Sequence, residues 1–275
     1  MPHGVMHEEE ETLVVASAAA EPRPAPERTI GRYVVVSRVG AGGMGEVFKA
    51  YDPMLGRLVA IKRVFSAKAP EVETQRLRRE AQAIAQLSHP NVIAVYDVGT
   101  SDELFMAMEY VEGMPLQKWL ESRRQPLDQI LGVFLQAARG LAAAHDAGLV
   151  HRDFKPSNVL VGDDGRVRVL DFGLARRPEL DDEPVDEEES GHPPRLLDQE
   201  LTKPGTLSGT PRYMAPEQFL ARDVDGRTDQ FGFCVALYEA LTDRRPFDGE
   251  QGILALAENV VKGRLIPIPT ELSLP

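Results

Sequence analysis

Gly40, Gly42 and Gly45 are the first residues of the chain whose types and spacing could do chemistry. They form a Gly-x-Gly-x-x-Gly pattern after a Val-rich run. Because glycine has no Cβ, such a loop lets backbone N–H groups approach a phosphate closely. The pattern alone also fits an ordinary turn, so the residues that follow it must decide between the two interpretations.

The residues after Gly45 separate two kinds of nucleotide site that use such glycines. A dinucleotide-binding oxidoreductase needs a helix directly after the loop, with the pyrophosphate at its N-terminus. Here Val47 and Lys49 alternate with their neighbours as in a strand, so we reject the oxidoreductase interpretation. A glycine loop between two strands resembles the nucleotide flap of protein kinases.

Further motifs extend this resemblance along the chain from about Tyr33. They are Val59-Ala60-Ile61-Lys62, His151-Arg152-Asp153-Phe154-Lys155-Pro156-Ser157-Asn158, Asp171-Phe172-Gly173 and Ala215-Pro216-Glu217. In this order they are similar to the signature set of protein kinases, and in particular to bacterial eukaryotic-like (Hanks-type) Ser/Thr kinases. The resemblance implies an α+β fold, bilobal and protein-kinase-like, with a β-rich N-lobe and an α-helical C-lobe.

The same resemblance implies an enzyme, a serine/threonine protein kinase that transfers the γ-phosphate of ATP to Ser and Thr hydroxyls of protein substrates. The alternative is a catalytically impaired ATP-binding pseudokinase or scaffold. Asp153 is expected to orient the substrate hydroxyl and accept its proton, and Lys155 to face the γ-phosphate. Lys62 is expected to hold the α- and β-phosphates, with Glu80 as its partner and Glu73 as the rival candidate.

The implied cofactors are ATP and Mg²⁺, with Mn²⁺ as an alternative ion. Asp171 and Asn158 are expected to hold the metal, which prefers hard oxygen ligands. Around ATP, the glycines would cover the phosphates, three apolar side chains would enclose adenine, and two hinge backbones would bond to it. These residues are Gly40, Gly42, Gly45, Val47, Ala60, Lys62, Glu109, Val111 and Leu160, with Met108 behind the hinge. The apolar residues alone would look the same in an ordinary core.

Arg152 implies control by phosphorylation, because kinases with Arg before the catalytic Asp are often switched at the activation loop, where Arg grips a phosphate bidentately. We expect autophosphorylation on Thr206 or Thr202. Thr210 resembles the loop threonine that contacts the catalytic Asp and Lys. These three threonines are the regulatory candidates.

An acidic insertion over residues 178–200 lengthens this activation segment. Its stretch 179–189 contains eight of the 43 acidic residues, and four more occupy 8–11, so these twelve equal the formal net charge of −12. The net charge argues against a nucleic-acid partner, which requires a basic surface. The insertion is either a tolerated surface loop or a pseudo-phosphate that occupies the basic pocket or repels acidic substrates.

The elements that must position these residues follow from periodicity. Short strands are expected from Tyr33 to Met108, interrupted by a helix over 71–87. Beyond Gly113 the pattern is mainly helical, with a long amphipathic helix from Leu127. Residues 228–242 are apolar on most sides, which predicts a buried helix and a buried Cys234. The resemblance adds a column linking the lobes, formed by Ile84, Val95, His151 and Phe172 and anchored by Asp229.

The domain organisation is expected to be simple. Residues 1–31 are an Ala/Pro/Glu-rich disordered leader, and 32–275 form the kinase domain, with the N-lobe at about 32–110 and the C-lobe at about 111–275. The C-lobe is expected to be incomplete at its C-terminus, without the Arg that pairs with the glutamate matching Glu217. No membrane span or secretory signal is expected, which predicts a cytoplasmic protein. The sequence does not set the oligomeric state.

Overall fold

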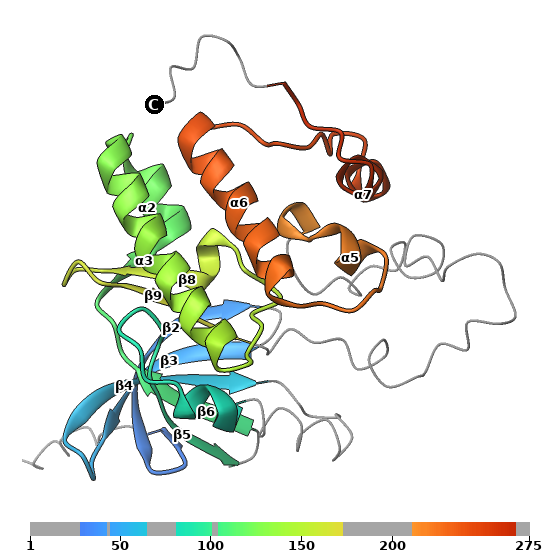
Figure 1. Ribbon diagram of the computed structural model, residues 1–275. Coiled ribbons are helices and arrows are strands. Elements are labelled where there is room, and N and C mark those ends of the chain that lie inside the picture. The colour runs from blue at the N-terminus through green and yellow to red at the C-terminus, as the bar shows by residue number, and fades with distance from the viewer. Residues whose placement is uncertain (1–27, 43–44, 65–80, 101–103, 173–210, 268–275) are drawn as a thin grey trace, which may run out of the picture.

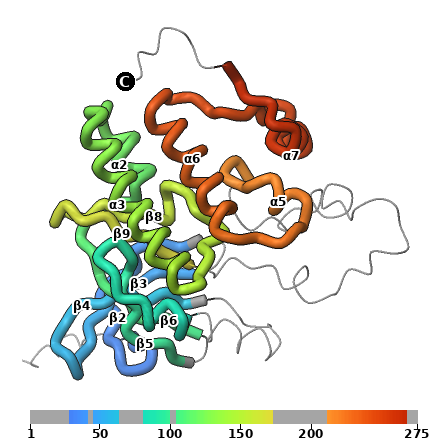
Figure 2. The backbone as a smooth tube through the Cα atoms, in the orientation of Figure 1, coloured from blue at the N-terminus to red at the C-terminus, as the bar shows by residue number. Residues whose placement is uncertain are grey.

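The computed structural model describes residues 28–42, 45–64, 81–100, 104–172 and 211–267. In Figure 1 a curled antiparallel sheet forms one half of the molecule and helices form the other, with strands β8 and β9 between them. The chain passes once from the first half to the second, as the tube in Figure 2 shows. The α+β, two-lobed architecture expected from the sequence is therefore confirmed.

The N-lobe sheet has six strands in the spatial order β1-β2-β3-β4-β6-β5, and every neighbouring pair is antiparallel. The strands are β1 (Thr29–Ile30), β2 (Tyr33–Gly42), β3 (Gly45–Asp52), β4 (Arg57–Val64), β5 (Val95–Thr100) and β6 (Leu104–Glu109).

Alternation along β4 decides which of its side chains reach the cleft between the lobes. Val59 and Ile61 are buried in a small core on one face of the sheet. Ala60 and Lys62 point to the opposite face, because successive side chains of a strand alternate. There Ala60 packs against the large core cluster that joins the lobes.

The first strand corrects the expected start of the domain. Thr29 and Ile30 lie in the predicted leader, yet they form β1, which pairs with β2. Ile30 is 5% exposed and belongs to the N-lobe core. The leader was assigned from composition, and a single apolar residue in a polar context does not alter composition enough to mark a strand.

The C-lobe contains α2 (Leu116–Ser122), α3 (Leu127–Asp146), α5 (Pro216–Phe219), α6 (Gly226–Thr242) and α7 (Ile253–Val261). The short helices η1 (Pro156–Asn158) and η2 (Pro211–Tyr213) flank the site. A second sheet consists of β7 (Gly113–Pro115), β8 (Val159–Gly162) and β9 (Val167–Val169). Helix α3 packs against both α6 and β9, so it ties this sheet to the helical core.

Two helix predictions have different outcomes. The long amphipathic helix is confirmed as α3, which buries a stripe that includes Phe134, Ala137 and Leu141. Helix α6 also forms, but the prediction that Cys234 is buried was wrong, because Cys234 is exposed. An apolar residue on almost every side of a helix gives no periodic signal for its outer face. Of the helix expected over 71–87, residues 81–87 lie within the described part of the chain; 81–86 are helical, and the helix ends before Leu87.

One core cluster crosses between the lobes. It contains Ile84 and Val95 from the N-lobe side together with Phe172, as expected for the predicted column. None of the helices in the described part of the chain is long and apolar enough to span a membrane.

Candidate functional site

The path from α3 into the catalytic loop, defined here as residues 151–158, is set by a glycine turn. The helix ends in a Schellman arrangement, in which Leu149 N donates to Ala144 O at 2.8 Å and Gly148 N donates to His145 O at 2.9 Å. Gly148 has φ 75°, a left-handed conformation that a side chain would disfavour. This turn directs the chain back across the helix end toward His151.

Asp229 of α6 fixes the first residues of the catalytic loop. Its carboxylate accepts hydrogen bonds from His151 N and Arg152 N, both at 2.7 Å, and also contacts His145 Nε2 at 2.7 Å. Arg152 has φ 67°, which costs energy in a residue other than glycine. Gln218 Nε2 donates to Arg152 O at 2.8 Å, so both backbone polar groups of this strained residue are held.

Asp153, Lys155 and Asn158 meet within this loop. Lys155 Nζ lies 2.6 Å from Asp153 Oδ2. Asn158 Nδ2 donates to Asp153 O at 2.8 Å and to Asp153 Oδ2 at 3.2 Å. Both donors use the same carboxylate oxygen, and Oδ1 has no protein partner among the described residues. Asp153 therefore presents an oriented carboxylate with one oxygen open to an incoming donor.

His151 is buried completely, and its ring supports the loop on both sides. Asp153 N donates to Nδ1 at 3.2 Å, and Nε2 lies 2.6 Å from Leu170 O. Because a carbonyl oxygen can only accept, Nε2 carries the proton and the ring is neutral. Burial lowers the pKa of His151 below its ordinary value of 6.5. The ring also packs on Phe172 at 4.8 Å between centroids, which agrees with the structural role expected from the sequence.

Lys62 reaches from the N-lobe to the C-lobe. Its Nζ lies 2.7 Å from Asp171 Oδ1, and the residue is only 6% exposed. Asp171 adopts φ 59°, so the chain turns sharply directly after Leu170. The sequence assigned a helix glutamate to Lys62, but Glu80 and Glu73 lie outside the described residues. The partner that the structure does describe is Asp171.

The predicted adenine wall lies around the same cleft. Val47 pairs in register with Lys62, and Ala60 pairs with Met108, so their side chains share the cleft face of the sheet. Val47, Ala60 and Leu160 are each only partly buried. Fully buried residues adjoin them along the chain, namely Phe48, Val59, Ile61 and Val159. This pattern is typical of a pocket lining and differs from that of a closed core.

The glycines expected to cover the phosphates lie at one end of the N-lobe sheet. Gly42 and Gly45 are paired residues at the end of the β2–β3 hairpin, and Gly40 pairs with Val47. An added Cβ at Gly40 would meet no atom within 4 Å, so Gly40 is not required by internal packing. Its lack of a side chain leaves room beside the hairpin for another molecule.

The hinge residues Glu109 and Val111 offer different backbone groups. Glu109 N donates to Ala94 O at 2.9 Å, so only its carbonyl is available to a ligand. Val111 N has no hydrogen-bond acceptor within the described ranges. A carbonyl acceptor and an N–H donor two residues apart match the two bonds that the sequence assigned to the hinge.

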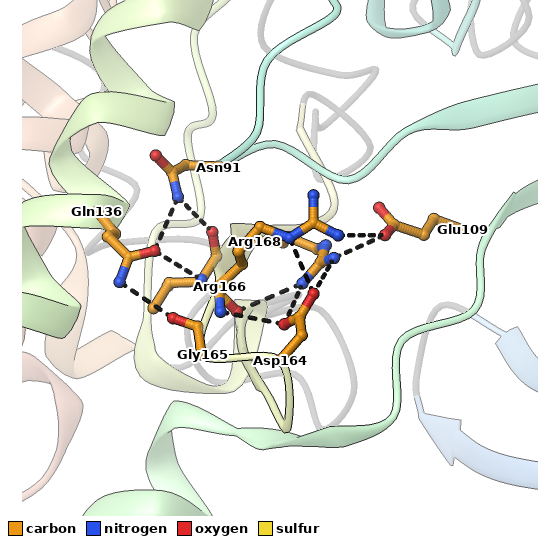
Figure 3. A network of polar contacts seen from close by, with 8 residues as sticks. Asn91, Glu109, Gln136, Asp164, Gly165, Arg166 and Arg168 are labelled. Carbon is orange, nitrogen blue, oxygen red and sulfur yellow. Dashed lines mark hydrogen bonds and ion pairs between the residues drawn. The ribbon is translucent and has the colours of Figure 1, made fainter.

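A network behind the hinge was not anticipated from the sequence (Figure 3). Arg168 of β9 is 2% exposed and lies 2.8 Å from Glu109 Oε1 and 2.9 Å from Asp164 Oδ2. The hydrogen bond from Arg168 holds the pKa of Asp164 well below its usual range, and Asp164 in turn raises the pKa of Arg168. Arg166 also bonds to Asp164, at 2.8 Å. An arginine between two valines of a three-residue strand is the sequence signal for such a buried charge.

Asn91 and Gln136 extend this support to α3 (Figure 3). Asn91 Nδ2 donates to Val167 O at 2.8 Å and to Gln136 Oε1 at 3.2 Å. Val167 N donates to the same Gln136 oxygen at 3.0 Å, and Gln136 Nε2 donates to Gly165 O at 3.3 Å. The β8–β9 hairpin is therefore held by α3 on one side and by the hinge on the other.

Glu217 has a hydrogen-bond partner that the sequence did not predict. It is partly buried, and Thr228 Oγ1 donates a hydrogen bond to its Oε1. A hydroxyl on the following helix thus occupies one of its oxygens. Sequence spacing could not predict this contact, because it depends on how α5 packs beside α6.

Some predicted residues cannot be placed. Glu80, Thr202, Thr206, Thr210 and the acidic insertion over 178–200 lie outside the described residues. Among the residues that the structure does describe, no group of three or more His, Cys, Asp or Glu side chains could hold a metal ion. Mg²⁺ commonly uses one or two protein ligands together with substrate phosphates. Asn158 and Asp171 together supply two such ligands, and their role in holding Mg²⁺ stays a prediction.

Comparisons with known proteins agree with this geometry. The protein kinase domain matches residues 33–273. The serine/threonine-protein kinase PknA of Mycobacterium tuberculosis is 37% identical over 250 residues, which cover 88% of this chain and 54% of PknA. The serine/threonine-protein kinase PksC of Streptomyces coelicolor is 37% identical over 256 residues, which cover 89% of this chain and 43% of PksC.

A solved structure shows the same fold. The crystal structure of the kinase domain of PknI from Mycobacterium tuberculosis superposes with a TM-score of 0.61 at 29% sequence identity, covering 82% of this chain and 78% of that chain. The chain spans about half the length of PknA and of PksC.

Proposed function

The chain belongs to the protein kinase family, and on this basis we propose that it is a serine/threonine protein kinase that transfers the γ-phosphate of ATP to protein hydroxyls. One observation carries the proposal. The Asp153 carboxylate is held at 2.6 Å by Lys155 and at 3.2 Å by Asn158, in a loop anchored by Asp229. A fixed acceptor for a hydroxyl proton beside a fixed cation is what phosphoryl transfer requires of the protein.

On the acceptor side, Asp153 orients the Ser or Thr hydroxyl through its open oxygen and takes the proton as the new O–P bond forms. The bond between the γ-phosphorus and the β–γ bridging oxygen breaks in the same transfer, and ADP leaves. Lys155 stands beside that carboxylate, where its charge stabilises negative charge that develops on the transferred group. The direct contact between Lys155 and Asp153 holds the two side chains next to each other before substrate arrives.

On the nucleotide side, Lys62 is suited to hold phosphate oxygens, because it is a nearly buried cation at the cleft face of β4. Val47, Ala60 and Leu160 would enclose adenine, and the Glu109 carbonyl and Val111 N–H would bond to its edge. Arg168 supports this hinge from behind by fixing the side chain of Glu109. These contacts bind and orient the nucleotide without taking part in bond making.

The residues that would hold Mg²⁺ are Asp171 and Asn158. Asp171 offers hard carboxylate oxygens and lies beside Lys62, and the Asn158 side-chain oxygen is free of hydrogen bonds within the described residues. When bound, the ion would neutralise charge on the phosphate oxygens and draw electron density from the leaving group. Mn²⁺ has the same ligand preference and is the alternative.

The test is γ-phosphate transfer from radiolabelled ATP to a generic protein substrate, with Asp153→Asn as the matched variant. We expect the rate to fall by roughly 100-fold or more, since general base and positioning roles are lost together. Equal labelling by both proteins would refute the proposal. If wild-type protein binds ATP but transfers nothing, the pseudokinase or scaffold alternative is favoured.

We also propose activation by autophosphorylation of Thr206 or Thr202. Support comes from Arg152, whose buried Nε has no hydrogen-bond partner in the structure as described. A phosphate can supply that partner and bind the guanidinium bidentately. After incubation with MgATP, peptide mass analysis should find phosphate between residues 202 and 210. Absence of phosphate from that peptide in an active preparation would refute this part.

The place of action that we propose is the cytoplasm, the compartment that supplies ATP. A chain with a single cysteine has no need of an oxidising environment for its fold. Fractionation of cells that produce the tagged protein would test this proposal, and recovery in the membrane or secreted fraction would contradict it.

A further inference from the structure

Lys49 is a cation on the wall of the nucleotide cleft to which the proposed mechanism gives no task. It lies on β3 two residues after Val47, so both side chains lie on the same face of the sheet. In register, Lys49 pairs with Ala60, and Ala60 pairs with Met108 at the end of β6. This cross-strand row leads from Lys49 directly to the hinge.

The Lys49 side chain ends on an aromatic ring of that hinge. Its Nζ lies 4.4 Å from the ring centroid of Tyr110, within the distance at which a cation is attracted to an aromatic face. Both residues are partly buried, and no carboxylate in the described ranges forms an ion pair with Lys49. The ring is therefore the main partner of this ammonium group.

The location gives the contact a consequence. Tyr110 lies between Glu109 and Val111, whose backbones are the expected adenine partners, and Lys49 follows Val47, an expected adenine neighbour. The contact thus joins β3, which carries Val47, to the hinge that follows β6. A nucleotide that enters or leaves beside the hinge must pass the joined side chains.

We propose that Lys49 and Tyr110 form a clasp across the mouth of the nucleotide pocket that slows both binding and release of nucleotide. The Lys49–Tyr110 contact must break for a nucleotide to pass in either direction, so breaking it is a step common to entry and exit. A barrier common to both directions changes the two rates in parallel and leaves the equilibrium affinity almost unchanged. Lys49 and Tyr110 are in this sense positioning residues, not catalytic ones.

This inference rests on the proposed function, because it assumes that ATP and ADP use this cleft. The experiment is stopped-flow measurement of a fluorescent ADP analogue binding to and leaving the purified protein. The variants are Lys49→Met and Tyr110→Leu, which remove the charge and the ring. Lys49→Arg and Tyr110→Phe are the matched controls, because each keeps the cation or the aromatic face.

We expect Lys49→Met and Tyr110→Leu each to raise the association and dissociation rates by roughly 2- to 5-fold, the range for a partly exposed cation–aromatic contact. The double variant should be no faster than the faster single variant, because the two changes remove one contact. Lys49→Arg and Tyr110→Phe should stay close to wild type. Thermal unfolding of each variant checks that the fold is intact.

Different results overturn the proposal in distinguishable ways. If Lys49→Met weakens affinity without changing the association rate, Lys49 contacts the nucleotide directly and there is no clasp. Additive effects in the double variant, or unchanged rates in both single variants, would also refute the clasp while leaving the kinase function intact. If wild-type protein binds no nucleotide, both the clasp and the proposed function fail.

Discussion

The catalytic loop and the hinge, taken here as residues 109–112, are held in opposite ways. The loop is fixed from within the C-lobe, by Asp229 of α6 and Gln218 of α5. The hinge is fixed by side chains that come from different parts of the chain, namely Arg168 of β9 behind it and Lys49 of β3 in front.

This difference separates two tasks. The acceptor carboxylate has to be in place before any substrate arrives, and hydrogen bonds to the backbone impose one geometry on it. The nucleotide has to enter and leave, and contacts between long side chains can open without unfolding either lobe. The loop should therefore be sensitive in stability and turnover, and the hinge mainly in nucleotide binding.

The strongest test of this comparison is Asp229→Asn. The Asp229 carboxylate accepts two backbone N–H bonds and also contacts His145. The asparagine side chain has one acceptor oxygen, and its hydrogen bonds lack the charge-assisted strength of those to a carboxylate. We expect the free energy of unfolding to fall by about 2–4 kcal/mol and turnover to fall by roughly 100-fold. Urea unfolding and steady-state kinetics measure the two effects.

The control for this variant is Asp225→Asn at the exposed start of the same helix, where the side chain accepts a bond from Arg227 N. This change should leave turnover unaltered. If both variants lose the same stability and activity, the buried carboxylate has no special role in holding the loop.

The next test is Arg168→Met, which tests the hinge. It leaves the carboxylates of Glu109 and Asp164 without their buried cation. We expect a loss of about 1.5–3 kcal/mol in the free energy of unfolding and a several-fold higher KM for ATP, with turnover at saturating ATP preserved. Arg166→Met, at a half-exposed side chain, should have a smaller effect. A fall in turnover without a change in KM would contradict the division of tasks.

A smaller effect is expected from pH. The pKa of the buried His151 is lowered from 6.5, so below that pH the unfolded chain binds a proton that the folded protein does not. The stability that His151 contributes is therefore fully present above about pH 6.5 and is lost as the pH falls below that value. The slope of the free energy of unfolding then approaches about 1.4 kcal/mol per pH unit. Unfolding curves between pH 8 and pH 5 measure this slope. His151→Phe should flatten it, and an identical slope in that variant would show that other groups cause it.

The smallest effect is expected from a change at Cys234, which lies on α6 like Asp229 but is exposed. Cys234 is exposed, so a thiol reagent should label it in the folded protein without denaturant. Cys234→Ser should change the free energy of unfolding by less than about 0.5 kcal/mol. Labelling that requires denaturant would show that the thiol is covered.

Much of the fold could be predicted because its signals are local. The alternation in β4 and the stripe of α3 each arise within one element. The motif residues Asp153, Lys155 and Asn158 are close in sequence, so a single short loop suffices to bring them together. The start of the domain and the exposure of Cys234 were predicted wrongly, because composition and an all-round apolar helix carry no directional signal.

The sequence by itself determined the class of fold and the residue types at the cleft, since periodicity and motif order are properties of neighbouring residues. The tertiary structure decided which groups hold those residues in place. Asp229 lies 78 residues from His151, and Arg168 lies 59 residues from Glu109. Partners at such separations are chosen by the packing of whole elements, which brings together side chains whose local patterns are unrelated. The same packing brings Lys49 over Tyr110, and the clasp we infer depends on that meeting.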